Sequence, residues 1–426
     1  MLRRQPHRGA RPFTFPAPLR RHGPLAETRQ RGDRPAQDQA GAPDLRHAGG
    51  GTVTAALGGI APALLEDWFR DRYFAATTDI SSSGVRNWAL GELRELLGVS
   101  VAELDGLVFR DSPSCGRQEL TDAVADRYRP GPDHRVMVTH GSSEALFLAL
   151  SALLRPGDEV VVPRPAYQSL VSTVEALGAR PVPWELAPAD GFAPDLDRLA
   201  ALLGPRTRLV VANFPHNPTG ASLTPDDHGR FLDLMARHPA FLLWDGAMAE
   251  LVYDGDRLPD PTGVLPRAIS TGSFSKAFGL PGLRIGWCVA PPDLVRDMVR
   301  LRDYTTLNSS PLNEFLATAV LRGADAVLAP RLRTARANLD ALLSWATAHP
   351  DLIDCPRPRG GVTAFPRLRG LDDTRRLCEW LADERGVLTV PGDCFGHPDR
   401  VRIGFGGPTD ELARGLAELT RALRAR

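Results

Sequence analysis

Lysine is almost missing from this sequence. Lys276 stands alone against 50 arginines, which is the 51 basic residues less one, in a chain of 426 residues. Arginine replaces lysine in most surface roles, but it stays protonated and does not form an imine with an aldehyde. A bias toward arginine explains the arginines and leaves the remaining lysine unexplained. Unless Lys276 is a chance survivor, it is a candidate for a chemical role.

Charge imbalance, long apolar runs and paired cysteines are also absent. The formal net charge is zero, so nothing indicates a nucleic-acid partner. No apolar run reaches membrane-spanning length and no apolar signal core opens the chain, so we expect no membrane partner. The five cysteines form no Cys-x-x-Cys pair, so we expect no metal site and a reducing, cytoplasmic location.

The composition changes along the chain. Residues 1–50 carry ten arginines and no sustained apolar periodicity, which predicts a disordered, arginine-rich tail over 1–58, with a transit peptide as the alternative. Residues 63–74 show the spacing of an amphipathic helix. The predicted parts after the tail are the start of a small domain at 59–105, a large domain at 106–308, and a linking helix with the rest of the small domain at 309–426.

Short β-branched runs alternate with helical stretches in the middle of the chain. The runs span residues 136–139, 159–162, 209–212 and 241–244. This alternation predicts βαβ units, and hence an α/β fold with a mostly parallel sheet covered by helices on both faces. A long helical pattern follows at 324–348. Sheets of this kind place their ligands beyond the carboxyl ends of the strands.

Four motifs follow or end predicted strands, in one order along the chain. They are His140-Gly141-Ser142-Ser143-Glu144, Asn213-Phe214-Pro215-His216-Asn217-Pro218-Thr219-Gly220, Trp244-Asp245-Gly246-Ala247, and Ser273-Phe274-Ser275-Lys276 with Arg284 eight residues later. Taken singly, the first and third have the alternative of a helix cap, and the second that of a proline-rich turn.

Together the motifs predict a binding site for a ligand that carries several different chemical groups. Small residues at the start of a helix leave backbone N–H groups free to bind an anion. A carboxylate at the end of a buried strand, such as Asp245, needs a cationic partner. A lysine near hydroxyls and an arginine suits a group that carries an aldehyde and a phosphate.

The joint order of the motifs resembles the pyridoxal 5′-phosphate (PLP) enzymes of fold type I, the aminotransferase class I/II superfamily, over residues 60–426. The resemblance implies PLP as cofactor, an amino acid as the small-molecule substrate, a second, smaller α+β domain and a homodimer. It implies that Lys276 binds PLP covalently and moves the α-proton, that Asp245 pairs with the pyridine nitrogen, and that Asn217 donates to the phenolic oxygen.

Further contacts are implied by the same resemblance. Arg402 would bind the substrate α-carboxylate through its planar guanidinium, and Gly84 would also contact the substrate. Tyr167 would stack on the cofactor ring, with an ordinary core tyrosine as the alternative. The implied phosphate ligands are Ser142, Ser143, Ser273, Ser275 and Arg284.

The chain departs from the superfamily pattern at two places. Met248 stands three residues after Asp245, where the superfamily usually has a tyrosine. Residues 111–116 lack the tyrosine that relatives often supply to the neighbouring subunit's phosphate. The phenol at the first position normally tunes the lysine imine and the cofactor oxygen, so its loss weighs against efficient transamination.

A narrower family shares these departures. Residues 79–85, 213–220, 280–284 and 359–366 resemble capreomycidine synthases, which cyclise 3-hydroxyarginine in antibiotic biosynthesis. The resemblance implies a PLP-dependent lyase that dehydrates its substrate and adds the guanidine within the same molecule. The alternatives are an aminotransferase acting on an arginine-like amino acid, and a transcription regulator with this fold, although no pair of amphipathic helices precedes the domain.

Overall fold

The computed structural model describes residues 59–253 and 255–425. These residues belong to one compact unit. The tail predicted over 1–58 lies outside the described residues. The division of the ordered chain at residues 105 and 308 stays a prediction.

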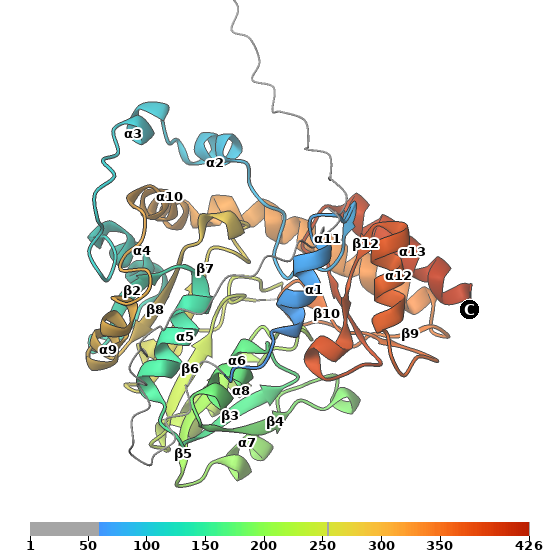
Figure 1. Ribbon diagram of the computed structural model, residues 1–426, viewed down its shortest axis with the longest axis horizontal. Helices are drawn as coiled ribbons and strands as arrows, with labels where there is room; N and C mark the ends of the chain where they lie inside the picture. The colour runs from blue at the N-terminus through green and yellow to red at the C-terminus, as the bar shows by residue number, and fades with distance from the viewer. Residues whose placement is uncertain (1–58, 254, 426) are drawn as a thin grey trace, which may run out of the picture. The chain divides into compact units, whose positions relative to one another are not determined.

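A seven-stranded sheet forms the centre of the fold (Figure 1). Its strand order is β2-β8-β7-β6-β5-β3-β4, and only β8 runs antiparallel to its two neighbours. The strands are β2 (Arg135–Thr139), β3 (Glu159–Arg164), β4 (Arg180–Glu185), β5 (Thr207–Ala212), β6 (Phe241–Asp245), β7 (Ala268–Ser273) and β8 (Gly286–Ala290). The four β-branched runs correspond to β2, β3, β5 and β6, and the α/β fold with a mostly parallel sheet is confirmed.

Helices cover both faces of this sheet. Successive strand side chains point to opposite faces, so Val160 and Val162 of β3 join one apolar core while Val161 joins the other. The first core includes side chains of α5 (Gly141–Leu153), α6 (Ser169–Ala176) and α9 (Pro292–Arg302). The second includes side chains of α4 (Gln118–Tyr128), α7 (Leu196–Leu202), α8 (Pro225–Ala236) and α10 (Pro311–Arg322). Burial on both faces explains why the strands read as continuous apolar runs.

Smaller sheets and three helices make up the C-terminal part. The three-stranded sheet has the order β10-β14-β13, and β9 pairs with β11. The predicted helix at 324–348 is α11, with the expected bounds. The elements are α11 (Ala324–Ala348), β9 (Ile353–Asp354), β10 (Thr363–Ala364), β11 (Arg367–Leu368), α12 (Arg375–Arg385), β12 (Val387–Leu388), β13 (Val390–Pro391), β14 (Val401–Gly404) and α13 (Thr409–Arg424).

The first described residues pack against this C-terminal part. The helix expected at 63–74 is α1 (Leu64–Arg72), and Trp68 Nε1 donates to the carbonyl of Thr389 at 2.9 Å. Strand β1 (Thr78–Asp79) pairs in parallel with β12. Two short helices, α2 (Leu90–Leu97) and α3 (Val101–Asp105), then lead into α4. Segments from both ends of the described chain therefore meet beside the central sheet.

Four single-turn helices complete the fold, and they are Pro188–Asp190, Pro261–Gly263, Pro281–Leu283 and Gly392–Phe395. No helix among the described residues is both long enough and apolar enough to cross a membrane. The cytoplasmic location stays a prediction.

Candidate active site

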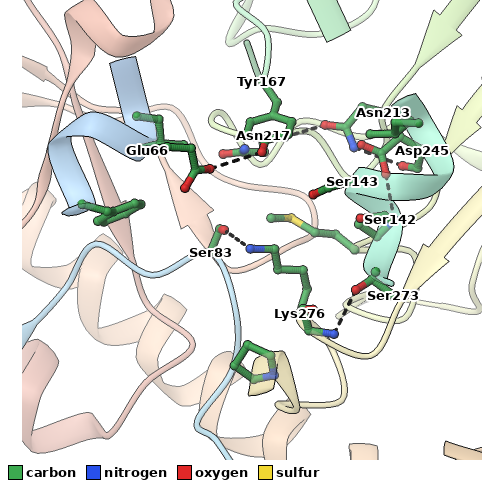
Figure 2. A pocket seen from close by; sticks show the side chains of 18 of the residues that line it. Glu66, Ser83, Ser142, Ser143, Tyr167, Asn213, Asn217, Asp245, Ser273 and Lys276 are labelled. Atoms are coloured by element: carbon green, nitrogen blue, oxygen red, sulfur yellow. Dashed lines mark hydrogen bonds between the residues drawn. The ribbon is translucent and has the colours of Figure 1, made fainter. Parts of the chain in front are cut away.

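A cavity of about 470 Å³ opens beyond the carboxyl ends of the central strands. Ten of the eleven predicted site residues line it, and Gly84 is the exception. In Figure 2 the labelled side chains converge from different elements, with Ser142 and Ser143 on α5 and Glu66 on α1. The lining residues that were predicted are Ser142, Ser143, Tyr167, Asn217, Asp245, Ser273, Ser275, Lys276, Arg284 and Arg402.

Lys276 follows β7 and is half-buried in the cavity. Its Nζ donates a hydrogen bond to Ser83 Oγ at 3.0 Å (Figure 2). Burial lowers the pKa of the Lys276 amine to about 8; the charge of Arg402 adds to this effect and that of Glu66 opposes it. An amine with a lowered pKa is more often neutral near physiological pH, and only a neutral amine attacks a carbonyl or accepts a proton.

Asp245 is the last residue of β6 and is 5% exposed. Its Oδ1 accepts from the backbone N–H of Ala247 at 3.2 Å and from the hydroxyl of Thr271 at 3.5 Å. Burial raises the pKa of Asp245 to about 6, and no side chain in the described part of the chain forms an ion pair with it. Such a carboxylate fits a protonated ring nitrogen, which would supply the missing positive charge.

The loop after β5 is tied to Asp245 through Asn213. The Asn213 side chain donates from Nδ2 to the carbonyl of Asp245 at 3.0 Å, and its Oδ1 accepts from the backbone N–H of Asn217 at 3.0 Å. This places the Asn217 amide in the cavity. Asn213 belonged to the motif read from the sequence, but its positioning role was not predicted.

Arg402 brings a positive charge from β14 into the cavity. It is 1% exposed, and it donates to Asn217 Oδ1 at 3.0 Å and to the carbonyl of Ser81 at 2.8 Å. Its Nε has no partner among the described residues, which also supply no carboxylate within ion-pair distance. Burial lowers the pKa of Arg402 to about 10, so the guanidinium remains charged at neutral pH. A buried cation with an unused donor fits an anionic group of a ligand.

A second anion site lies at the start of α5. Gly141 has φ of +79°, and a Cβ there would stand 3.0 Å from Arg284 Nη2, so glycine allows Arg284 to approach the helix. Arg284 Nη2 lies 3.5 Å from the carbonyl of His140. The first backbone N–H groups of a helix have no partners within the helix and favour negative charge. With the hydroxyls of Ser142 and Ser143, they form a cradle that suits a phosphate.

Tyr167 and Met248 also line the cavity. Tyr167 is half-buried, and its hydroxyl donates to Glu66 Oε1 at 3.2 Å (Figure 2). Met248 is buried and presents a thioether, which cannot donate a proton, at the position where the superfamily usually has tyrosine. Tyr167 is therefore available to stack on a ring, whereas no phenol at position 248 tunes the lysine.

Gly84 lies behind Lys276 and does not line the cavity. A Cβ there would stand 3.1 Å from the carbonyl oxygen of Ser275, and the next residue, Val85, donates its N–H to the carbonyl of Lys276 at 3.1 Å. The glycine lets its segment approach the lysine backbone and so places Ser83 against Lys276. A direct contact of Gly84 with the substrate stays a prediction.

Sequence reasoning did not identify Ser83 and Glu66 as residues that line the cavity. Ser83 lies in residues 79–85, where the narrower resemblance was a usable signal. Glu66 lies in an amphipathic helix with no motif, and nothing in the sequence connected it to the strand ends.

The residues present fit PLP. Asp245 would pair with the ring nitrogen, Asn217 would contact the phenolic oxygen, and Lys276 would hold the aldehyde carbon. The cradle of Ser142, Ser143, Ser273, Ser275 and Arg284 would hold the phosphate. Among the described residues, no group of three His, Cys, Asp or Glu side chains is placed to hold a metal ion.

The fold and this site define a PLP-dependent enzyme of fold type I. The chain belongs to the aminotransferase class I and II family, whose protein-family model matches residues 88–419.

Individual relatives narrow the class of enzyme further. The chain is 56% identical to the capreomycidine synthase of Streptomyces vinaceus over 375 residues, which are 88% of this chain and 96% of that protein. It is 31% identical to the arginine–pyruvate transaminase of Pseudomonas aeruginosa over 320 residues, 71% of this chain and 80% of the other. The solved structure of the PLP-dependent cyclase OrfR superposes with a TM-score of 0.82 at 41% identity, covering 86% of this chain and 98% of OrfR. The resemblances to fold type I and to capreomycidine synthases are confirmed.

Proposed function

We propose that this enzyme converts (3S)-3-hydroxyarginine into the cyclic amino acid capreomycidine, as a step of antibiotic biosynthesis. The observation that carries the proposal is the 56% identity to a capreomycidine synthase along 96% of that protein. The site supports it, because a lysine, a buried carboxylate and a buried guanidinium face one cavity.

The proposed reaction balances without an oxidant or an amino acceptor. The α-carbon gives its proton to the base, and the hydroxyl leaves the β-carbon as hydroxide, which takes up a proton and becomes water. A guanidine nitrogen then bonds to the β-carbon and gives up a proton, and a proton returns to the α-carbon. Bound PLP supplies the electron sink that stabilises negative charge at the α-carbon. The attacking nitrogen belongs to the same molecule, so ring closure has the advantage of proximity.

The protein's own residues have separate tasks in this scheme. Lys276, with its lowered pKa, takes the α-proton and returns it. Ser83 holds the Lys276 amine in place by a hydrogen bond at 3.0 Å. Asp245 keeps the ring nitrogen protonated. Arg402 binds the α-carboxylate with a guanidinium that is already fixed by Asn217 and Ser81.

Met248 favours cyclisation over the alternative function, amino transfer. An aminotransferase moves a proton from the α-carbon to the cofactor carbon, and its usual phenol near the lysine assists by tuning the amine. The thioether of Met248 offers no proton, and it is buried in the cavity wall. Cyclisation needs the proton only at the α-carbon.

We also propose a cytoplasmic homodimer with the active site near the subunit boundary. Large apolar side chains on the outside of the described chain support this, since a monomer gains nothing by exposing them. Phe74 is 94% exposed, Phe109 is 76% exposed and Tyr304 is 91% exposed. Light scattering that reports only a monomer at working concentration would contradict the dimer.

The proposed reaction is tested by its product. Enzyme, PLP and 3-hydroxyarginine are incubated in heavy water, and the product is compared with authentic capreomycidine by chromatography and mass spectrometry. We expect a product lighter than the substrate by one water, with deuterium at the α-carbon unless Lys276 returns the original proton. A keto acid as the main product would reject cyclisation.

A further inference from the structure

The cavity contains a carboxylate that the scheme above does not use. Among the residues that the structure describes, only two acidic side chains line the cavity, and they are Asp245 and Glu66. Asp245 is buried at the end of β6 and is reserved for the ring nitrogen. Glu66 belongs to α1 and is exposed, and Figure 2 shows it on the opposite side of the cavity from Asp245.

Glu66 has no cationic partner within the described part of the chain. Its Oε1 accepts from the hydroxyl of Tyr167 at 3.2 Å, and no described group donates to its Oε2. Its negative charge acts on the cavity: it raises the pKa of both Lys276 and Arg402, against the lowering that burial causes. The carboxylate therefore lies within electrostatic reach of the amine that does the chemistry and of the guanidinium that binds the α-carboxylate.

Helix α1 is fixed in place beside the cavity. Trp68 Nε1 donates to the carbonyl of Thr389 at 2.9 Å, and the backbone N–H of Leu64 donates to Gln168 Oε1 at 2.8 Å. Phe69, three residues after Glu66, lines the same cavity, as residues at this spacing share a helix face. The carboxylate is thus presented together with an aromatic ring.

An arginine-type amino acid carries charges that match this arrangement. Its α-carboxylate suits Arg402, and its planar guanidinium suits a carboxylate and aromatic faces. The other charged features of the cavity cannot take the guanidinium, because Lys276, Arg284 and Arg402 are cationic and Asp245 serves the ring nitrogen.

We propose that Glu66 binds the guanidinium of the substrate and thereby selects arginine-type amino acids. The inference rests on the proposed function and adds the residue that recognises the side chain. Tyr167 is the positioning residue, since its hydroxyl holds Glu66 Oε1. One hydrogen bond therefore joins Tyr167, whose ring would stack on the cofactor, to Glu66, whose carboxylate would bind the substrate guanidinium.

The test compares arginine with citrulline, whose urea has nearly the same shape but no charge. The readout is exchange of the α-hydrogen in heavy water, which needs no β-hydroxyl and no ring closure. For the wild-type enzyme, we expect arginine to reach half-saturation at a lower concentration than citrulline, by about tenfold or more. In Glu66→Gln, the half-saturating concentration of arginine should rise about tenfold to a hundredfold, as expected for loss of a charge-assisted hydrogen bond. The value for citrulline should change by less than about twofold.

Two variants serve as comparisons. Asp67→Asn removes the neighbouring carboxylate of α1, which pairs with Arg70 and does not line the cavity, and it should leave both values unchanged. Tyr167→Phe keeps the ring and removes the hydroxyl, and it should weaken arginine binding less than Glu66→Gln does.

The outcomes separate this inference from the proposed function. If the wild type cyclises 3-hydroxyarginine but Glu66→Gln keeps the preference for arginine, the Glu66 assignment alone is overturned. The Glu66 assignment is also overturned if Glu66→Gln weakens the binding of arginine and of citrulline equally, because Glu66 would then act only by supporting α1. A wild type that neither cyclises 3-hydroxyarginine nor prefers arginine overturns the proposed function and the assignment with it.

Discussion

The Nζ atom of Lys276 donates a hydrogen bond to the hydroxyl of Ser83 at 3.0 Å, across a sequence separation of 193 residues. Lys276 follows a central strand, whereas Ser83 belongs to the segment that packs on the C-terminal part through β1 and β12. The lysine amine is therefore positioned by both parts of the fold, and the site is complete only when the first described segment is in place.

Replacing Lys276 should remove covalent attachment of the cofactor. Since the chain has no other lysine, borohydride reduction of the wild type should label one peptide, and Lys276→Ala should show no label and no absorbance of lysine-bound PLP. Turnover should fall by about a hundredfold to ten-thousandfold, the usual contribution of a positioned general base. A persistent absorbance band of bound cofactor in Lys276→Ala would contradict this role.

The lowered pKa of Lys276 predicts how cofactor uptake depends on pH. The amine reacts with the aldehyde only when neutral, so the rate constant for uptake by the apoenzyme should rise about tenfold per pH unit and level off near pH 8. With an unperturbed lysine, the rate constant would keep rising up to about pH 10.5. The measurement is the growth of the absorbance of bound PLP after mixing, across a pH series. A rate constant still rising well above pH 9 would mean that burial does not perturb this amine.

Ser83→Ala tests the hydrogen bond to the lysine. We expect turnover to fall about twofold to tenfold, because a hydrogen bond of this kind contributes about 0.5–1.5 kcal/mol. The ammonium form loses an acceptor, so the midpoint of cofactor uptake should also move to lower pH, by less than about one unit. Ser83→Thr keeps the hydroxyl and should behave more like the wild type. Equal defects in both variants would indicate a packing effect instead.

Asp245→Asn tests the carboxylate at the ring nitrogen. Loss of one partner of a buried charge pair costs about 3–5 kcal/mol, so turnover should fall on the order of a hundredfold or more. The apoenzyme should not lose stability. Burial raises the pKa of Asp245 from 3.8 to about 6, so this group contributes stability below pH 4 and loses it as the pH rises through 6.

Above pH 6 the uncharged asparagine therefore removes an unfavourable buried charge from the apoenzyme. Thermal unfolding of the two apoenzymes at neutral pH checks this, and the midpoint of Asp245→Asn should equal or exceed that of the wild type. A large drop in the midpoint would show that Asp245 has a structural role rather than a cofactor role.

The sequence predicted those parts of the site that depend on local pattern. Asp245 and Asn217 follow apolar strands, and the carboxyl ends of neighbouring parallel strands meet at one edge of a sheet, so their convergence was predictable. The lysine was predictable because no other is present.

The contributions of α1 and residues 79–85 depend on long-range packing. Pairing of β1 with β12 joins residues 78–79 to 387–388, and two-residue strands leave no periodic signal in a sequence. Glu66 was missed for the same reason, since an exposed acidic residue on an amphipathic helix is ordinary until the helix is placed beside a cavity. Strand β8 was also not among the predicted runs, although Trp287, Cys288 and Val289 are buried in it.

The dependence of turnover on a keto acid tests the central claim most directly. Purified enzyme with PLP and excess 3-hydroxyarginine is followed over many turnovers without any keto acid, and the cofactor is identified at the end. The account predicts continued formation of the cyclic product with all the cofactor recovered as PLP, because cyclisation returns the cofactor unchanged. Turnover that stops after one equivalent, leaves pyridoxamine phosphate and resumes only when a keto acid is added would contradict cyclisation and identify an aminotransferase.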